Sequence, residues 1–387
     1  MDKEKLSVVS AIALNSIFGN DPRFSHNIID AMGSTEAVFS LTEEEQRRVF
    51  GPFSCFSGRI NSRALEQAER EYERLRGQGV QFVDIFDPHY PAVLRECPDA
   101  PLLLYIRSNT PVRKLFNSRP LISVVGTRDL SLYGKEWCTR IIKEIAATGA
   151  SPCIVSGLAL GVDITAHMAA LAFGLPTIGV SPVGIDSIYP ARHRTAAEKI
   201  IAREGGAIIT DYPPSTTPYP GNFLRRNRII AGLSSATILI ESKAKGGGMM
   251  TARLASGYGR DVLVLPGRID DVRSQGCNAL VREKIAEPIS SLDALPEMLG
   301  LKSGTQGRRI AFEDAVRRRL TACDDALREK LVRIAVTVKK NRGIDYDGIC
   351  SECDMDYSDV AYCAGLLESE GIITADILQR CCINAKF

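Results

Sequence analysis

The sequence predicts an α/β protein built around a doubly wound parallel sheet, because apolar β-rich runs recur at the spacing of strand–helix–strand units. Six such runs begin 24 to 32 residues apart, near Leu121, Cys153, Thr177, Ala207, Ala236 and Asp261. The runs are almost continuously apolar, as strands covered on both faces must be. Helical patterns fill the stretches between them, over residues 133–147, 164–173, 195–203, 224–233 and 251–258.

Other regions flank this central unit, which we place at residues 79–297. Residues 1–78 follow an amphipathic helical pattern and predict a small helical domain. Residues 80–107 hold short apolar runs broken by turn dipeptides, typical of strands and turns that connect to the sheet. Residues 298–315 are polar and indicate a linker. Residues 316–387, with two short helices, a turn, a third helix and a strand, predict a winged helix.

The composition excludes several classes of protein. The chain has 387 residues, and its 48 basic and 46 acidic side chains leave a net charge of only +2, so any anion site must be built locally. No apolar run approaches the ~18 residues of a membrane span. Asp2 and Glu4 argue against a secretory signal at the start. The 11 cysteines are irregularly spaced, which indicates reduced thiols in the cytoplasm.

The loops that follow the predicted strands should converge at one edge of the sheet, where open parallel sheets bind ligands. The first of these loops is Gly126-Thr127-Arg128. Gly126 permits a tight turn, Ser131 is placed to cap the next helix, and Arg128 adds a cation, so the loop can bind an anion. The alternative is a structural turn whose arginine pairs with a nearby carboxylate.

A second candidate is the helix start that carries Arg225, Arg226 and Arg228, with Asn222 expected to cap it. Cations at a helix N-terminus oppose the macrodipole unless an anion or carboxylates compensate them, which favours phosphate binding. Phe223 could stack on a base. The alternative is that Arg225 and Arg228 brace neighbouring loops and that Phe223 belongs to the core.

A third candidate is the run Gly246-Gly247-Gly248, whose backbone amides can hold a phosphate at a helix start. It is not a P-loop, because no Lys-Ser or Lys-Thr follows the glycines, and a flexible loop is the alternative.

Two apparent metal or catalytic patterns are weak. Asp163 and His167 share a helix face, but no third ligand has a characteristic spacing, so a structural contact between the two is expected. Cys350 and Cys353 lack the second pair of a zinc site, so no metal is predicted there.

Several segments carry a family resemblance: Val124-Val125-Gly126-Thr127-Arg128, Ser156-Gly157-Leu158-Ala159-Leu160-Gly161-Val162-Asp163, Tyr189-Pro190, and residues 223–234, 246–252 and 274–276. Together they resemble the bacterial DNA-processing protein A (Smf) family over about residues 80–290. The flanking regions also look like that family's N-terminal domain, of SAM or helix-hairpin-helix type, and its winged-helix C-terminal domain.

The resemblance implies a Rossmann-like protein of natural transformation that binds single-stranded DNA without reading its sequence. It also implies a cytoplasmic homodimer that loads the RecA recombinase onto DNA, with no enzymatic turnover and no cofactor. The residues expected to contact DNA are Gly126, Thr127, Arg128, Ser156, Gly157, Arg192, Asn222, Phe223, Arg225, Arg226, Arg228, Gly246, Gly247 and Gly248. Two positions depart from the family pattern: Leu160 stands where an arginine is common, and Leu224 where a proline is frequent.

Two other functions compete with this interpretation. A strand that ends in Ile240-Glu241 before a glycine-rich helix start resembles the site of nucleotide phosphoribohydrolases, but the glycine loop here carries no carboxylate for acid or base catalysis. A transcription regulator would use the presumed recognition helix over residues 358–369. That helix has no arginine or lysine, so we expect it to contact protein rather than duplex DNA.

Overall fold

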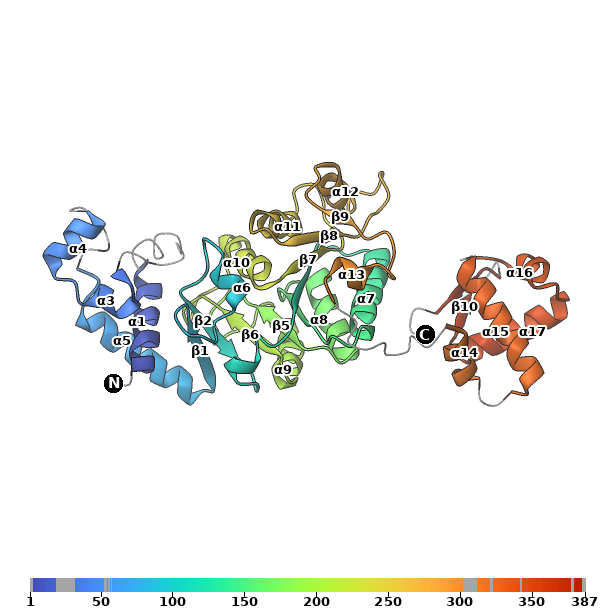
Figure 1. Cartoon of the computed structure of the whole chain (residues 1–387), viewed down its shortest axis with the longest axis horizontal. Coiled ribbons are helices and arrows are strands. Elements are labelled where there is room, and N and C mark those ends of the chain that lie inside the picture. The colour runs from blue at the N-terminus through green and yellow to red at the C-terminus, as the bar shows by residue number, and fades with distance from the viewer. Residues whose placement is uncertain are drawn as a thin grey trace. The chain divides into compact units, whose positions relative to one another are not determined.

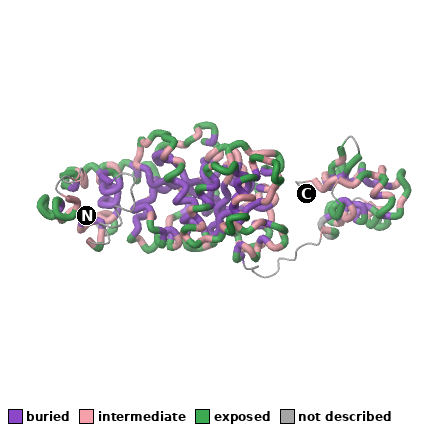
Figure 2. The backbone as a smooth tube through the Cα atoms, turned by 90° about the horizontal axis from the view of Figure 1, so that it is seen from above, coloured by how far each residue is buried: buried purple, intermediate pink, exposed green. Residues whose placement is uncertain are grey.

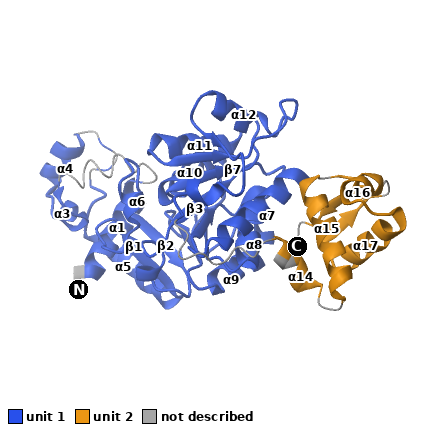
Figure 3. Cartoon of the chain, turned by 45° about the vertical axis from the view of Figure 1, so that its right-hand side comes forward, with its two compact units in different colours: residues 1–304 blue, residues 305–387 orange. Residues whose placement is uncertain are grey.

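The computed structural model describes residues 3–18, 32–51, 54, 56, 58–301, 312–320, 323–341, 343–376 and 379–384. The chain divides into two compact units, Met1–Gly304 and Thr305–Phe387 (Figure 3). Of the predicted linker, residues 298–315, residues 302–311 lie outside the described residues, and residues 312–315 belong to a helix, Phe312–Arg319.

The first unit is built on a nine-stranded sheet in the order β1-β2-β6-β5-β4-β3-β7-β8-β9 (Figure 1). Its strands are β1 (Val80–Asp84), β2 (Leu103–Arg107), β3 (Leu121–Val125), β4 (Cys153–Ser156), β5 (Thr177–Val180), β6 (Ala207–Thr210), β7 (Ala236–Leu239), β8 (Asp261–Val264) and β9 (Glu287–Pro288). The strands β3 to β8 are parallel and begin at the six predicted residues, so the doubly wound α/β fold is confirmed.

The region before the parallel strands contributes to the sheet itself. Strand β2 pairs antiparallel with β6, and β1 pairs antiparallel with β2, so the predicted connector adds two strands at one edge. The chain order reverses on either side of β3, which lies between β4 and β7. This reversal is the point at which an open α/β sheet forms a crevice for ligands.

Helices cover both faces of the sheet because alternate residues of each strand point to opposite sides. Ile122 and Val124 of β3 pack with α7 (Leu132–Ala147), α8 (Val162–Ala172) and α13 (Leu295–Met298). Leu121 and Val125 pack on the other face with α6 (Ala92–Arg95), α10 (Pro220–Leu233), α11 (Gly247–Gly257) and α12 (Gln275–Arg282). Figure 2 shows the buried residues gathered in the middle of the first unit.

The remaining described helices of the first unit either precede β1 in the chain or pack on β5 and β6. They are α1 (Lys3–Phe18), α3 (Thr35–Phe39), α4 (Glu43–Phe50), α5 (Ser62–Gly77) and α9 (Arg194–Ala202), with short 3-10 turns η1 (Val112–Lys114) and η2 (Ala191–His193). Helix α1 packs against α5, β1 and β2. The side chain of Asn61 caps α5 by accepting a hydrogen bond from the Ala64 N–H.

The second unit has its own buried core, which includes Leu331, Ile334, Val360 and Leu367. It consists of α14 (Phe312–Arg319), α15 (Asp325–Lys340), α16 (Tyr346–Cys353), α17 (Tyr357–Ser369) and an antiparallel hairpin of β10 (Ile373–Ala375) and β11 (Cys381–Ile383). The assignment of this unit as a winged helix stays a prediction.

Candidate nucleic-acid interface

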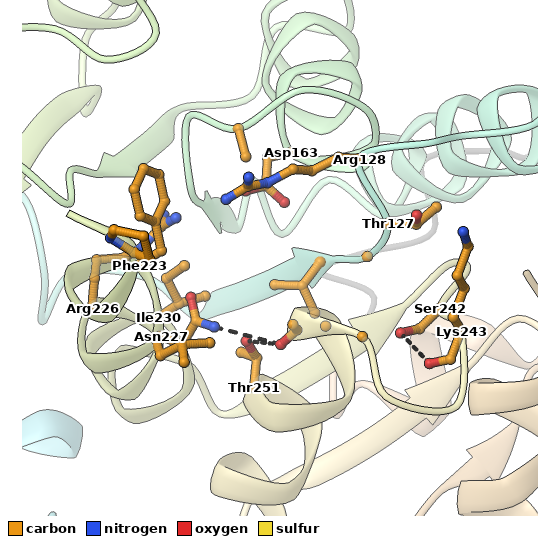
Figure 4. A pocket seen from close by; sticks show the side chains of 18 of the residues that line it. Thr127, Arg128, Asp163, Phe223, Arg226, Asn227, Ile230, Ser242, Lys243 and Thr251 are labelled. Carbon is orange, nitrogen blue, oxygen red and sulfur yellow. Dashed lines mark hydrogen bonds between the residues drawn. The ribbon is translucent and has the colours of Figure 1, made fainter. Parts of the chain in front are cut away.

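A cavity of about 720 Å³ opens beyond the carboxyl ends of β3 and β7, at the reversal point of the sheet (Figure 4). Its walls come from the loop after β3, from α10 and the residues just before it, and from the loop and first turns of α11. Ala159, Asp163 of α8 and Tyr189 complete the lining.

The loop after β3 is fixed by backbone contacts on two sides. The Thr127 N–H donates to the Glu241 carbonyl at 2.7 Å, and the Thr127 carbonyl accepts from the Val162 N–H at 3.1 Å. A Cβ on Gly126 would lie 2.5 Å from Val162 Cγ2 and 2.8 Å from the Glu241 carbonyl oxygen, so only glycine fits there. The predicted capping role of Ser131 is confirmed, since its Oγ accepts from the Gly134 N–H at 3.0 Å.

Arg128 and Phe223 form the mouth of the cavity. The Arg128 guanidinium lies over the Phe223 ring, 4.9 Å from its centroid, and Figure 4 shows the side chain reaching toward that ring. The Tyr189 ring meets Phe223 edge to face, with centroids 5.5 Å apart. Arg128 is exposed and Phe223 is half-buried, so both can reach a ligand that enters from solvent.

Arg226 lies at the floor of the cavity and is 3 % exposed. Its Nη1 donates to the Val180 carbonyl at 2.8 Å. A Cβ on Gly157 would lie 2.0 Å from Arg226 Nη1 and 2.3 Å from Asp163 Oδ2, so this glycine makes room for both charged groups. Burial raises the pKa of Asp163, and the charge of Arg226 opposes that rise.

Arg228 points away from the cavity into the protein. Its Nη1 donates to the Asp99 carbonyl at 2.6 Å, and its Nη2 donates to the carboxylate of Asp211. The pair is buried on both sides, with side chains 9 % and 7 % exposed. Arg225 is exposed on the same helix, and within the described ranges it makes no ion pair.

The start of α10 differs from the predicted one. The helix begins at Pro220 and its N-cap residue is Tyr219, so the expectation that Asn222 caps it is wrong. Asn222 is buried within the helix, and its Nδ2 donates to the Thr217 carbonyl at 3.4 Å. Arg226 and Arg228 therefore lie beyond the first turn, where buried carboxylates offset their charge.

The glycine run forms the start of α11, with Gly246 as the N-cap residue. A Cβ on Gly248 would lie 3.0 Å from Gly126 Cα, so the loops after β3 and β7 touch through their backbones. Lys243 and Lys245 are exposed and line the cavity. The DNA contacts predicted from the sequence include the three glycines but not these two lysines, although the lysines directly precede the glycine run.

The predicted site residues separate into two groups. The lining of the cavity contains Gly126, Thr127, Arg128, Phe223, Arg226, Gly246, Gly247 and Gly248. Six others lie outside the lining: Ser156, Gly157, Arg192, Asn222, Arg225 and Arg228. Ser156 is fully buried and donates to the Val124 carbonyl at 2.6 Å, whereas Arg192 is exposed in η2.

His167 does not bond with Asp163 as expected. Its Nδ1 bonds with the Thr177 hydroxyl at 2.7 Å and its Nε2 with the Gly157 carbonyl at 2.5 Å. Burial lowers the pKa of His167 to about 4. No group of three His, Cys, Asp or Glu side chains in the described ranges could hold a metal ion.

Glu241, the carboxylate that precedes the glycine run in the sequence, is 1 % exposed and bonded to the start of α7. It accepts from the Ser131 N–H at 3.0 Å and from the Ser131 hydroxyl. A carboxylate held in this way organises the loop and is not free to act on a ligand. The geometry thus gives no support to the phosphoribohydrolase alternative.

The fold and cavity together define a Rossmann-like α/β protein with a cavity at the reversal point of its sheet, lined by exposed cations and aromatic rings. Residues 81–300 match the family model of the DNA recombination-mediator protein A, and the chain belongs to this family.

Relatives and solved structures agree with this membership. The chain is 39 % identical to Protein Smf of Synechocystis sp. over 220 residues, 57 % of this chain and 54 % of that protein. It is 37 % identical to the DNA processing protein DprA of Streptococcus pneumoniae over 213 residues, 55 % of this chain and 72 % of that protein. The match thus spans about half of the length of the Synechocystis relative.

Among solved structures, DNA processing protein A of Streptococcus pneumoniae matches with a TM-score of 0.59 and 29 % identity, covering 76 % of this chain and 96 % of that chain. The Helicobacter pylori protein, whose structure concerns its single-stranded DNA binding mode, matches with a TM-score of 0.50 and 32 % identity, covering 57 % of this chain and 96 % of that chain. In the described part of the chain, no helix has the length and apolarity to cross a membrane.

Proposed function

We propose that this protein binds single-stranded DNA at the cavity beyond β3 and β7, without reading its sequence, and loads the RecA recombinase during natural transformation. The observation that carries the binding proposal is the Arg128 guanidinium stacked 4.9 Å from the Phe223 ring at a cationic mouth. The cation can bind a phosphate, and the aromatic ring beside it can stack on a base of any identity.

The charges of the site support an anionic ligand. Arg128, Lys243 and Lys245 are exposed in the lining. The two carboxylates of the lining are engaged or buried: Asp129 pairs with Arg273 at 3.0 Å, and Asp163 is 8 % exposed. The backbone amides at the start of α11 add positive potential.

The other predicted arginines have different roles in this proposal. Arg226 and Arg228 are positioning residues, because their guanidinium groups are buried against protein partners. Arg225 and Arg192 are exposed and can bind phosphates of a strand that extends beyond the cavity. In this proposal Ser156, Gly157 and Asn222 do not contact DNA but support the residues that line the cavity.

Binding is tested by fluorescence anisotropy of a labelled oligo-dT with duplex of equal length as competitor. We expect the single strand to be preferred, with log K falling against log salt by about 0.7 for each phosphate neutralised. Phe223→Ala should lose about 1 to 3 kcal/mol of binding free energy, the usual value of one base stack. Arg128→Ala should weaken binding and flatten the salt dependence. A wild type that ignores the strand, or two variants that bind like it, contradict the proposal.

RecA loading and dimerisation need their own measurements. Loading predicts that the protein accelerates RecA filament formation on strands coated with single-strand-binding protein, and that Arg128→Ala removes the acceleration. A homodimer through the Rossmann-like unit predicts twice the chain mass by light scattering. The proposal includes no catalysis and no cofactor.

A further inference from the structure

Helix α5 carries a row of four exposed polar side chains on one face, and three of them are arginines. Arg63, Gln67, Arg70 and Arg74 recur at steps of four, three and four residues, which places them above one another along the helix. All four are exposed. From Arg63 to Arg74 the row extends about 16 Å at the rise of an α-helix.

The carboxylates of the same helix are mostly engaged elsewhere. Glu69 and Glu73 both bind Lys5 of α1, at 2.8 and 2.6 Å. Glu71 accepts from the Tyr105 hydroxyl at 3.2 Å. Glu66 is the remaining carboxylate of α5, and it forms no ion pair with the arginines of the row.

Helix α4 shows the contrasting arrangement. Its Arg47 and Arg48 each lie near a glutamate one turn earlier, with Arg47 3.6 Å from Glu43 and Arg48 2.6 Å from Glu44. Among the described residues, Arg63, Arg70 and Arg74 have no such ion pair. The three arginines of the α5 row are therefore exposed cations without an ion pair in the described part of the chain, although the whole chain has a net charge of only +2.

A second cavity, of about 520 Å³, opens at the start of this row between α1 and α5. Arg59, Asn61, Arg63 and Gln67 line it with hydrogen-bond donors. Arg59 and Arg63 are exposed there. Its lining carboxyl is Glu71, half-buried and bonded to Tyr105 as described above.

The chain connects this surface to the DNA cavity. Asn15 of α1 donates to the Asp211 carbonyl at 2.7 Å, at the carboxyl end of β6. Nine residues later the same segment reaches Pro220, which lines the DNA cavity beside Tyr219. The Tyr219 side chain is 66 % exposed, so it offers an accessible ring at the edge of the DNA cavity.

We propose that the α5 row of Arg63, Arg70 and Arg74, together with Arg59, binds the phosphates of a single strand that continues from the DNA cavity. The proposal rests on the proposed function, because the strand must first occupy that cavity. Exposed arginines in a row neutralise a backbone without sequence preference. The helical N-terminal part thereby lengthens the binding site.

The test compares full-length wild type with Arg70→Gln/Arg74→Gln, using labelled oligo-dT of about 6 and about 30 nucleotides. Glutamine is a good helix former, so α5 should keep its structure. At about 0.1 M salt a slope of 0.7 per phosphate corresponds to roughly fivefold weaker binding for each cation removed. We expect the double variant to lose this factor of affinity for the long strand at each of its two substituted arginines, with a shallower salt dependence. Its affinity for the short strand should equal that of wild type.

Two further variants sharpen the result. Arg47→Gln/Arg48→Gln removes the same charge from α4, where the arginines have glutamates nearby, and should lose much less affinity for the long strand. Glu66→Gln should tighten binding of the long strand. If Arg70→Gln/Arg74→Gln binds the long strand like wild type, or weakens both strands equally, the proposal is overturned and an acidic protein surface becomes the better partner. If wild type fails to bind even the short strand, the proposed function itself is refuted.

Discussion

His167 should make the first unit sensitive to acid. The imidazole is fully buried in α8, between the Thr177 hydroxyl and the Gly157 carbonyl. Burial lowers its pKa from 6.5 to about 4, and the charge of Arg226 acts in the same direction. The folded protein therefore holds His167 neutral at pH values where the unfolded chain protonates it.

The sign and size of the effect follow from linkage. A folded-state pKa below the unfolded one stabilises the fold above pH 6.5, and this stabilisation is lost as the pH falls toward 4. The full difference is about 3.4 kcal/mol, at about 1.36 kcal/mol per pH unit. By about pH 5 the loss should be about 2 kcal/mol.

The assay is urea unfolding followed by the fluorescence of Trp137, the single tryptophan of the chain, which lies in α7 and so reports on the first unit. Wild type and His167→Gln are compared between pH 7 and pH 5. Because other buried groups such as Asp163 titrate in both proteins, the difference between the two pH profiles isolates His167. The variant should lose about 2 kcal/mol less than wild type over this interval.

His89→Gln serves as the matched control, because it removes an imidazole that is exposed in a turn rather than buried. Equal pH profiles for wild type and His167→Gln would refute the reasoning. A variant that is less stable at pH 7 but has a flatter profile would support it.

Three other changes test the site. Arg228→Met should cost about 3 to 5 kcal/mol in urea unfolding, because it leaves the Asp211 carboxylate buried and unpaired, whereas Arg225→Met on the exposed side of α10 should change stability by less than about 0.5 kcal/mol. Gly157→Ala should weaken oligo-dT binding measured by anisotropy, since its Cβ would displace Arg226, and binding equal to wild type would argue against Arg226 as a positioning residue. Leu160→Arg adds a cation at an exposed position next to Ala159 of the lining, so it should tighten binding about fivefold near 0.1 M salt, while Leu160→Gln should not.

The fold could be predicted from the sequence because strands buried on both faces leave a strong signal. The runs at Leu121 and Ala236 are apolar at every strand position but one each, Ser123 and Thr237, and both begin where predicted. The sequence did not predict that β1 and β2 join the sheet. Strand β2 joins it by pairing with β6, and the paired residues lie about 100 positions apart in the chain.

The site could be predicted only in part, for physical reasons. The loops after parallel strands converge at one edge of the sheet, and this edge brings Gly126 and Gly248 together. The glycine loops and Arg128 could therefore be predicted as site residues because they directly follow strands. The direction in which an arginine points depends on the helix start, and α10 begins two residues before Asn222. One sequence does not reveal that Asp211, 17 residues earlier, turns Arg228 inward.

The clamp on Thr127 by Glu241 on one side and Val162 on the other has a kinetic consequence. A loop held by the segment after β7 and by the start of α8 has little conformational entropy to lose when a ligand arrives. Capture of a strand should then be limited by diffusion and charge steering rather than by loop ordering. The association rate constant should therefore depend steeply on ionic strength and only weakly on temperature beyond the viscosity of water.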